Sequence, residues 1–358
     1  MTKTITWRRF LNEHLDQTVA IGLHILALIS FVIFTMFAVE QVQSDELDKS
    51  CIGNNLIDQL PAQALSDARL EASNTPNGQG LFWKISKDGQ KPSWLYGTMH
   101  VTDPRVLNLS DNVKQAIDQS DKVVIETLDL LDPLKAQAAL LKNPELTMFT
   151  NGQKLTSTMT DDDKSFVEAE LDKRGIPASF VARLKPWMVM SLVSVPECEQ
   201  QRKANGDQIL DFQIFERAKI QGIELDGLET ILEQVSAMAS LPIDFQVKGL
   251  VESLRLGDVL TDVSETMTQL YLQENIALIT PALKAVAIEL SQDESPDEDF
   301  GAFEAKIILE RNYLMAERAE PILNNGNAFI AVGALHLPGQ EGVIELLRKQ
   351  GFEITRVQ

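Results

Sequence analysis

Two histidines end the same short motif in this sequence and are the first candidates for chemistry. One apolar run leads into Gly97-x-x-His100, and a second leads into Gly333-x-x-His336. Each motif places an imidazole just past the carboxyl end of an expected strand, the edge at which open α/β sheets bind their ligands. We therefore expect the two imidazoles to meet at one site. For a single histidine after a strand, a purely structural role is the ordinary alternative.

Two glutamates, Glu126 and Glu229, also follow short expected strands. Imidazoles combined with carboxylates suit a divalent transition metal. Such an ion polarises a carbonyl group and lowers the pKa of a bound water, while a spare carboxylate accepts the proton. The chemistry expected is amide or peptide hydrolysis. Whether Glu126 or Glu229 is the ligand or the base stays open, as does a role for either as a surface or helix-capping carboxylate.

Other common catalytic motifs do not occur in this chain. It contains no H-E-x-x-H, G-x-S-x-G, P-loop or G-x-G-x-x-G pattern, so the usual zincin, serine hydrolase and nucleotide-binding interpretations have no support. Cys51 and Cys198 are the two cysteines, and they form no C-x-x-C pair. A cysteine metal cluster is therefore excluded, while one disulfide and two free thiols both remain open.

The elements that would position these residues predict an α/β fold. A central mixed β-sheet is expected, and the repeated Gly-x-x-His motif raises the idea of two related halves. Residues 130–200 and 231–323 read as large helical insertions. Ser110 is expected to cap one of the remaining helices. The expected strands are 80–86, paired as a hairpin with 93–96, then 122–125, 223–225, 327–332 and 351–357, and the other helices are 110–119, 207–220 and 341–349.

The N-terminal part predicts one transmembrane helix. Residues 18–39 contain no Asp, Glu, Lys or Arg, and as a helix they would rise roughly 33 Å, enough to cross a bilayer. Arg8 and Arg9 precede this segment, so residues 1–17 are expected in the cytoplasm and the main domain outside it, in the periplasm or the extracellular space. Residues 40–79 are expected to form a stalk. A signal peptide cut after Ser44 is the alternative.

The balance of charge argues against nucleic acid as a partner. The formal net charge is −20, and almost all of it follows the apolar segment. Nucleic acids are bound by clustered Lys and Arg side chains, so a domain this acidic would be repelled by a phosphate backbone.

Several further motifs make the chain resemble the TraB/GumN family, which is similar to the TIKI proteases. The resemblance covers about residues 80–358, with the motifs in the family's order. The residues that carry it are Trp94 to His100, Lys185 to Trp187, Gly206-Asp207, Gly227 to Thr230, Arg311-Asn312 and Gly333 to Gly339.

The resemblance implies a metal-dependent protease that uses manganese, cobalt or zinc. It implies that His100 and His336 are metal ligands, joined by Glu126 or Glu229. Arg311 would stabilise developing negative charge or hold a substrate carboxylate, and its alternative is a helix-surface salt bridge. Asn312 and Asp207 would lie behind the ligands or against the substrate. Asp207 would orient Arg311 or a histidine, and its alternative is a helix N-cap.

The function that follows is a membrane-anchored metal-dependent hydrolase, expected to cleave a peptide or protein with an activated water. The alternative is a binding or regulatory protein of the same fold that captures a peptide, a metal or haem without turnover. A third hypothesis is metal-free hydrolysis with a histidine as general base, as in the distantly similar erythromycin esterases. Fold-level kinship does not decide among them.

Overall fold

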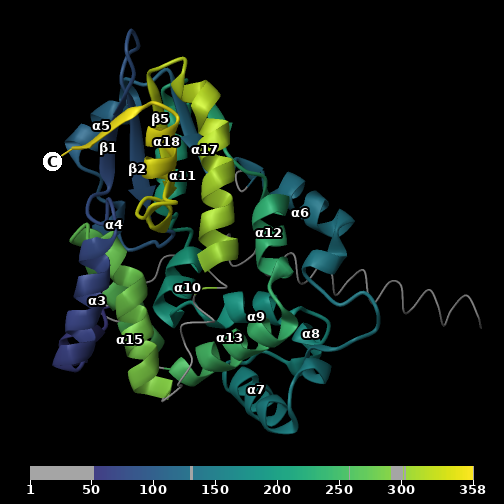
Figure 1. Ribbon diagram of the computed structural model, residues 1–358. Coiled ribbons are helices and arrows are strands. Elements are labelled where there is room, and N and C mark those ends of the chain that lie inside the picture. The colour runs from purple at the N-terminus through teal and green to yellow at the C-terminus, as the bar shows by residue number, and fades with distance from the viewer. Residues whose placement is uncertain (1–51, 130–131, 258, 292–300, 302–303, 358) are drawn as a thin grey trace, which may run out of the picture.

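The computed structural model describes residues 52–129, 132–257, 259–291, 301 and 304–357 (Figure 1). Its centre is a six-stranded sheet with the strand order β4-β3-β5-β2-β1-β6. The first four strands in this order are parallel, and β1 is antiparallel to both β2 and β6. The predicted mixed sheet is therefore confirmed. The strands are β1 (Phe82–Ser86), β2 (Ser93–Thr98), β3 (Lys122–Ile125), β4 (Glu224–Gly227), β5 (Ala328–Gly333) and β6 (Glu353–Arg356).

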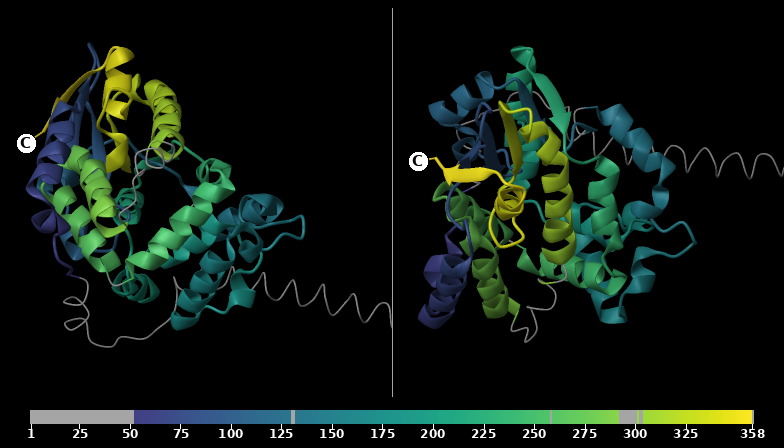
Figure 2. Two further views of the ribbon diagram at one scale, coloured as in Figure 1. Left: turned by 60° about the horizontal axis from the view of Figure 1, so that its bottom comes forward. Right: turned by 45° about the horizontal axis from the view of Figure 1, so that its top comes forward.

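The central strands are covered on both faces, which explains why they read as continuous apolar runs. Along β5, Phe329 and Ala331 face one hydrophobic cluster, while Ile330 and Val332 face another. Helices α3, α5, α11, α14 and α15 pack against the first cluster, and α17 and α18 against the second. Figure 2 shows the sheet between these two layers of helices. The result is a three-layer α/β arrangement.

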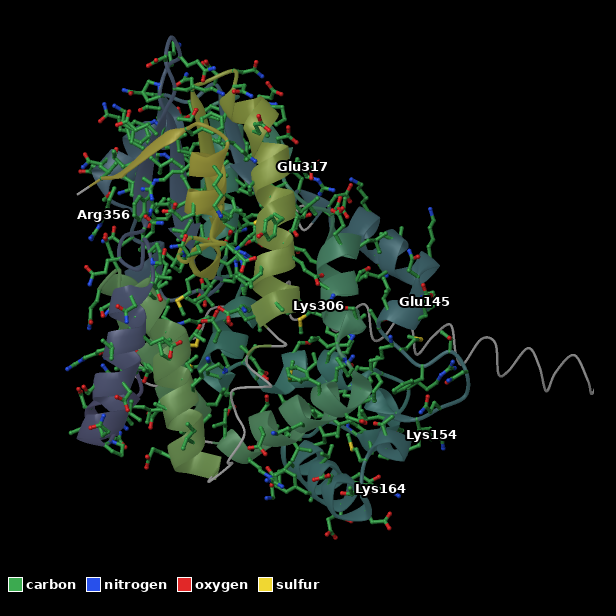
Figure 3. The ribbon with its side chains drawn as sticks, viewed as in Figure 1. Glu145, Lys154, Lys164, Lys306, Glu317 and Arg356 are labelled. Atoms are coloured by element: carbon green, nitrogen blue, oxygen red, sulfur yellow. The ribbon has the colours of Figure 1, made fainter. Side chains whose placement is uncertain are left out.

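The predicted insertion 130–200 and the beginning of the second one, up to α13, form a separate packed region, whereas α14, α15 and α17 of the second pack against the sheet. The hydrophobic cluster of the separate region joins α7, α9 and α13, and Figure 1 shows these helices beyond the end of the sheet. Charged side chains cover both regions, with Lys154 and Lys164 on the helical part and Glu317 and Arg356 on the α/β part (Figure 3). The helices of this region are α6 (Pro133–Lys142), α7 (Asp161–Lys173), α8 (Ala178–Val181), α9 (Pro186–Val193), α10 (Glu197–Ala204), α12 (Ile231–Ser240) and α13 (Ile243–Leu256).

The helices on the two faces of the sheet largely follow the expected positions. Ser110 caps α5 as expected, because its hydroxyl accepts the Val113 N–H. The helix predicted over 207–220 begins later, at Leu210. These helices are α3 (Ala62–Asn74), α4 (Pro104–Leu107), α5 (Asp111–Asp118), α11 (Leu210–Ile220), α14 (Val259–Leu272), α15 (Ile279–Ser291), α17 (Glu310–Leu323) and α18 (Val343–Lys349).

Part of the segment expected to be a stalk is folded onto the domain. Helix α3 packs against α15, and Leu56 donates its N–H to the Thr266 hydroxyl at 2.8 Å. Cys198 is disulfide-bonded, and Cys51 lies outside the described residues.

The predicted transmembrane segment, residues 18–39, also lies outside the described residues. Within the part of the chain that the structure describes, no helix has the length and apolar character needed to cross a bilayer.

Candidate metal centre

The two Gly-x-x-His motifs lie side by side because β2 and β5 are parallel neighbours. The strand register pairs Thr98 with Gly333. A β-carbon added at Gly97 would lie 2.7 Å from Leu337 Cδ1 and 3.1 Å from the Ala334 α-carbon, so a glycine here favours the close approach of the two turns. The sheet therefore delivers both histidines to the same edge.

Both imidazoles face one carboxylate oxygen at that edge. The distance from Glu126 Oε1 is 3.9 Å to His100 Nε2 and 3.8 Å to His336 Nε2. Glu126 directly follows β3, which lies beside β5 in the sheet. Three residues that the sequence analysis singled out are thus brought together from three neighbouring strands.

A hydrogen bond at the far side of the His336 ring fixes its tautomer. The Asn312 amide nitrogen donates to the Glu341 carbonyl at 2.9 Å, which turns the Asn312 amide oxygen toward His336. That oxygen accepts a hydrogen bond from His336 Nδ1 at 2.6 Å. The proton therefore lies on Nδ1, and the Nε2 lone pair faces Glu126.

Asp211 plays the corresponding role for His100. One carboxylate oxygen lies 2.9 Å from His100 Nδ1, and the other accepts the Thr98 hydroxyl at 2.8 Å. Desolvation lowers the pKa of His100, but the hydrogen bond and charge of Asp211, helped by the charge of Glu126, raise it to about 9. In the metal-free protein this ring holds a proton at neutral pH.

His336 has the opposite environment. Its side chain is 4% exposed, against 53% for His100. Burial, together with the positive charges of Arg311 and His100, lowers the pKa of His336 to about 4 despite the nearby Glu126 carboxylate. The ring is therefore neutral at pH 7, which is the form that binds metals.

Glu126 is held as an anion in a buried position. Burial would raise its pKa, but the His336 and His100 rings, the Arg311 guanidinium and the Gly333 N–H hold the pKa at about 2. The Gly333 N–H donates to Oε1 at 2.6 Å, and Arg311 Nη2 donates to Oε2 at 2.8 Å. A carboxylate with so low a pKa is a poor proton acceptor and a good ligand.

Glu229 lies behind Glu126 and pairs with Arg311. Arg311 Nε donates to Glu229 Oε1 at 2.9 Å, and Nη2 donates to Oε2 at 2.7 Å. The Gln234 amide nitrogen reaches both glutamates, at 3.1 Å from Glu126 Oε2 and 3.3 Å from Glu229 Oε2. Glu229 therefore orients and neutralises Arg311, and its described contacts include neither histidine.

Asp207 does not reach the site. Its side chain is exposed in the loop before α11, and the N-cap of that helix is Ile209. Asp211 instead makes the contact with His100 that was expected of Asp207. Gln234 is the other contributor that sequence reasoning missed. Neither residue belongs to a motif, so the sequence offered only their polar character.

Gly333, which has no side chain, lies beside the side chains of Glu126 and the two histidines. A β-carbon built at Gly333 would lie 3.1 Å from Glu126 Oε1, 3.4 Å from His336 Cδ2 and 3.8 Å from His100 Nε2. No group of three or more His, Cys, Asp or Glu side chains within the described ranges already has the spacing of a bound metal. The donor types nevertheless fit a divalent transition metal, because the Nε2 atoms of two histidines, once His100 has released its proton, and one ionised oxygen lie near one another.

Comparison with known proteins identifies the family of the chain. The model of the TraB/PrgY/gumN family matches residues 81–356, which include every residue of the site. The chain belongs to this family. No solved structure matches it.

Its curated relatives carry the names of metalloproteases. Metalloprotease TIKI1 of Danio rerio is 26% identical over 79% of this chain and 64% of its own length. Metalloprotease TIKI1 of Homo sapiens is 25% identical, over 76% of this chain and 61% of its own. A Metalloprotease TIKI homolog of Nematostella vectensis is 25% identical, over 79% and 68%. This TraB/PrgY/gumN chain thus spans somewhat less than two thirds of the first two relatives.

Proposed function

We propose that this family member is a metal-dependent hydrolase that cleaves peptide bonds. The observation that carries the proposal is the convergence of His100 Nε2 and His336 Nε2 on Glu126 Oε1. Each ring has its Nδ1 bonded to a side chain that leaves Nε2 available, which is how metal-binding histidines are oriented. The metalloprotease names of the relatives support a peptide or protein as substrate.

In this proposal His100, His336 and Glu126 hold manganese, cobalt or zinc. A bound ion would polarise the peptide carbonyl and lower the pKa of a water molecule toward neutrality. Asp211 and Asn312 keep the Nδ1 protons of the two rings in place, so that both Nε2 atoms face the ion. The half-exposed His100 marks the side from which a substrate approaches, because the His336 ring is buried.

The role of Arg311 changes from the one expected. Its guanidinium contacts Glu126 and Glu229 and donates Nη1 to the Ile307 carbonyl at 3.1 Å. Because two buried carboxylates and a carbonyl already accept hydrogen bonds from the Arg311 guanidinium, few of its N–H groups remain for a substrate. We assign Arg311 to charge compensation of Glu126, and not to binding a substrate carboxylate.

The first test measures metal content and peptide cleavage for wild type, His100→Ala and His336→Ala. We expect both variants to lose bound metal and to lose activity by more than about 100-fold, because even residues behind a ligand typically contribute 10- to 100-fold. Since His100 is half exposed, His100→Ala should fold normally. Glu317→Gln, an exposed change on α17, is the matched control.

The same measurements separate the alternatives. Metal bound at one equivalent without product would favour a binding or regulatory protein. Full activity in a strong chelator would favour metal-free hydrolysis with a histidine as base. A folded wild type that takes up no metal would overturn the proposal.

We further propose that residues 18–39 anchor the chain in a membrane, with the main domain outside the cytoplasm. The apolar length of this segment and the arginines before it support the proposal. A fusion of alkaline phosphatase to the C-terminus should be active in a bacterial host and inactive after deletion of 18–39. Activity of the deleted form would contradict it.

A further inference from the structure

The loop that carries His100 is held from two helices by two carboxylates. Asp211, in α11, contacts the loop at Thr98 and at His100. Glu199, in α10, contacts it at Thr102. The three anchored residues are thus spaced at two-residue intervals, with the histidine in the middle.

Glu199 binds Thr102 through both of its oxygens. Oε1 accepts the Thr102 N–H at 2.7 Å, and Oε2 accepts the Thr102 hydroxyl at 2.8 Å. Both residues are buried. Lys203, one turn later in α10, lies 3.6 Å from Oε1 and offsets part of the charge. A buried carboxylate with two short bonds to one residue restrains that residue strongly.

The far end of the loop is anchored separately. Asp103 accepts hydrogen bonds from Arg105, and Arg105 also pairs with Glu265 in α14. Glu199 therefore restrains the part of the loop between Thr98, which contacts Asp211, and Asp103. The His100 backbone lies in this part.

We propose that Glu199 is a positioning residue for His100: by fixing Thr102 it holds the loop so that the imidazole reaches both Asp211 and the metal centre. This inference rests on the proposed function. Without Glu199, Asp211 alone would hold the loop near the ring, and Nε2 would sample positions away from Glu126. Metal affinity would then fall without loss of any ligand.

The decisive variant is Glu199→Gln, which keeps the shape of the side chain. Its amide oxygen can still accept the Thr102 N–H, but its amide nitrogen cannot accept the Thr102 hydroxyl, so both charge-assisted bonds are replaced by weaker neutral ones and the hydroxyl must turn to accept. We expect Co²⁺ affinity, measured by titration calorimetry on the folded protein, to fall about tenfold. We also expect the visible absorption of the bound Co²⁺ to change, because the geometry at one nitrogen ligand changes.

Conservative variants separate positioning from general stability. Thr102→Ser keeps both donors and should match wild type, whereas Thr102→Val loses the hydroxyl and should weaken Co²⁺ binding. Thr102→Val combined with Glu199→Gln should be no weaker than Glu199→Gln alone. Glu197→Gln, an exposed acid on the same helix, is the control and should bind Co²⁺ normally. Equal affinity and an unchanged spectrum for Glu199→Gln would overturn the proposal.

A measurement on the metal-free protein keeps this inference separate from the proposed function. In Glu199→Gln we expect faster hydrogen exchange of the Thr102 amide and a changed ¹⁵N shift of His100 Nδ1 in nuclear magnetic resonance spectra. If wild type binds no Co²⁺, the proposed function fails while these two signals still judge the positioning role. If both signals equal those of wild type, the positioning role is refuted.

Discussion

At the scale of single residues, the two histidines share a motif and differ in everything around it. His336 is buried and neutral, and Asn312 fixes its tautomer. His100 is half exposed, and Asp211 favours its protonated form. A metal would therefore meet His336 in the neutral form that binds metals, whereas His100 must first release a proton. In the function proposed above, this asymmetry makes His100 the expected point of entry for both metal and substrate.

Residue types and spacing predicted the candidate site only in part. Residues directly after strands were found, because the carboxyl ends of parallel strands meet at one edge. This is why His100, His336 and Glu126 come together. The choice between Glu126 and Glu229 depended on which carboxylate faces the two histidines, and a linear sequence does not contain that information. Asp207 was singled out through the family motif Gly206-Asp207, but it lies in the loop before α11, whereas Asp211 lies in that helix and contacts His100.

Substitution of Gly333 tests the site without removing a ligand. The glycine has φ −53° and ψ 135°, angles that alanine adopts easily, so Gly333→Ala should fold. Its methyl group would nevertheless occupy the space between Glu126 and the two histidines. We expect metal affinity to fall at least about tenfold while the melting temperature of the metal-free protein changes little.

The control for this change is Gly301→Ala, where an added β-carbon meets no atom within 4 Å. It should bind metal as wild type does. Undiminished metal binding by Gly333→Ala would place the metal elsewhere in the molecule.

At the scale of helices and strands, the sequence predicted correctly the elements that depend on a single local cause, such as a turn or a helix cap. The 82–98 hairpin followed from two apolar runs around a glycine turn, and α5 from its serine cap. The strand order could not be predicted in the same way. β5 lies between β3 and β2 although it comes late in the chain, because packing on both faces, and not local propensity, places it there.

Helices α4 and α14 are joined by an ion pair between the half-buried Arg105 and the buried Glu265, and its contribution to stability should depend on pH. Arg105 donates to both oxygens of Glu265, at 2.9 and 2.6 Å. Burial raises the pKa of Glu265, but the hydrogen bonds from Arg105 and Gln269 lower it below its ordinary value. Its stabilising effect is therefore complete above the unfolded pKa of about 4.3 and is lost as the pH falls through the lower folded pKa.

Glu265→Gln should reduce the free energy of unfolding at pH 7 by about 2 kcal/mol, the typical contribution of hydrogen bonds to a charged group. Urea unfolding from pH 7 down to about 3 measures it, and the curves of wild type and variant should converge at the acid end. Glu252→Gln is the control, since Glu252 pairs with Arg255 at the surface, where ion pairs contribute little. A constant difference between wild type and Glu265→Gln at all pH values would contradict the assignment.

At the scale of the whole molecule, the site joins parts of the chain that are distant in sequence. The three proposed ligands follow β2, β3 and β5, while Asp211 and Arg311 come from helices on opposite faces of the sheet. An ion bound there would connect these parts only in the folded state, so it should stabilise that state. At 100 times its dissociation constant the gain is about 2.7 kcal/mol. For a domain of this size, that corresponds to a rise in melting temperature of roughly 4 to 5 °C.

Thermal unfolding with Mn²⁺, Co²⁺ or Zn²⁺ measures this rise in melting temperature. Because the chain is acidic, part of the rise can come from cations that bind the surface without a specific site. With 52 acidic and 32 basic side chains, the surface attracts any divalent cation. Mg²⁺ should reproduce that general effect without the specific one, because it prefers oxygen ligands. His336→Ala should likewise retain the general effect and lose the specific rise. An equal rise in wild type and in His336→Ala would mean that the ions bind the acidic surface, and that the three converging side chains stabilise the fold without a metal.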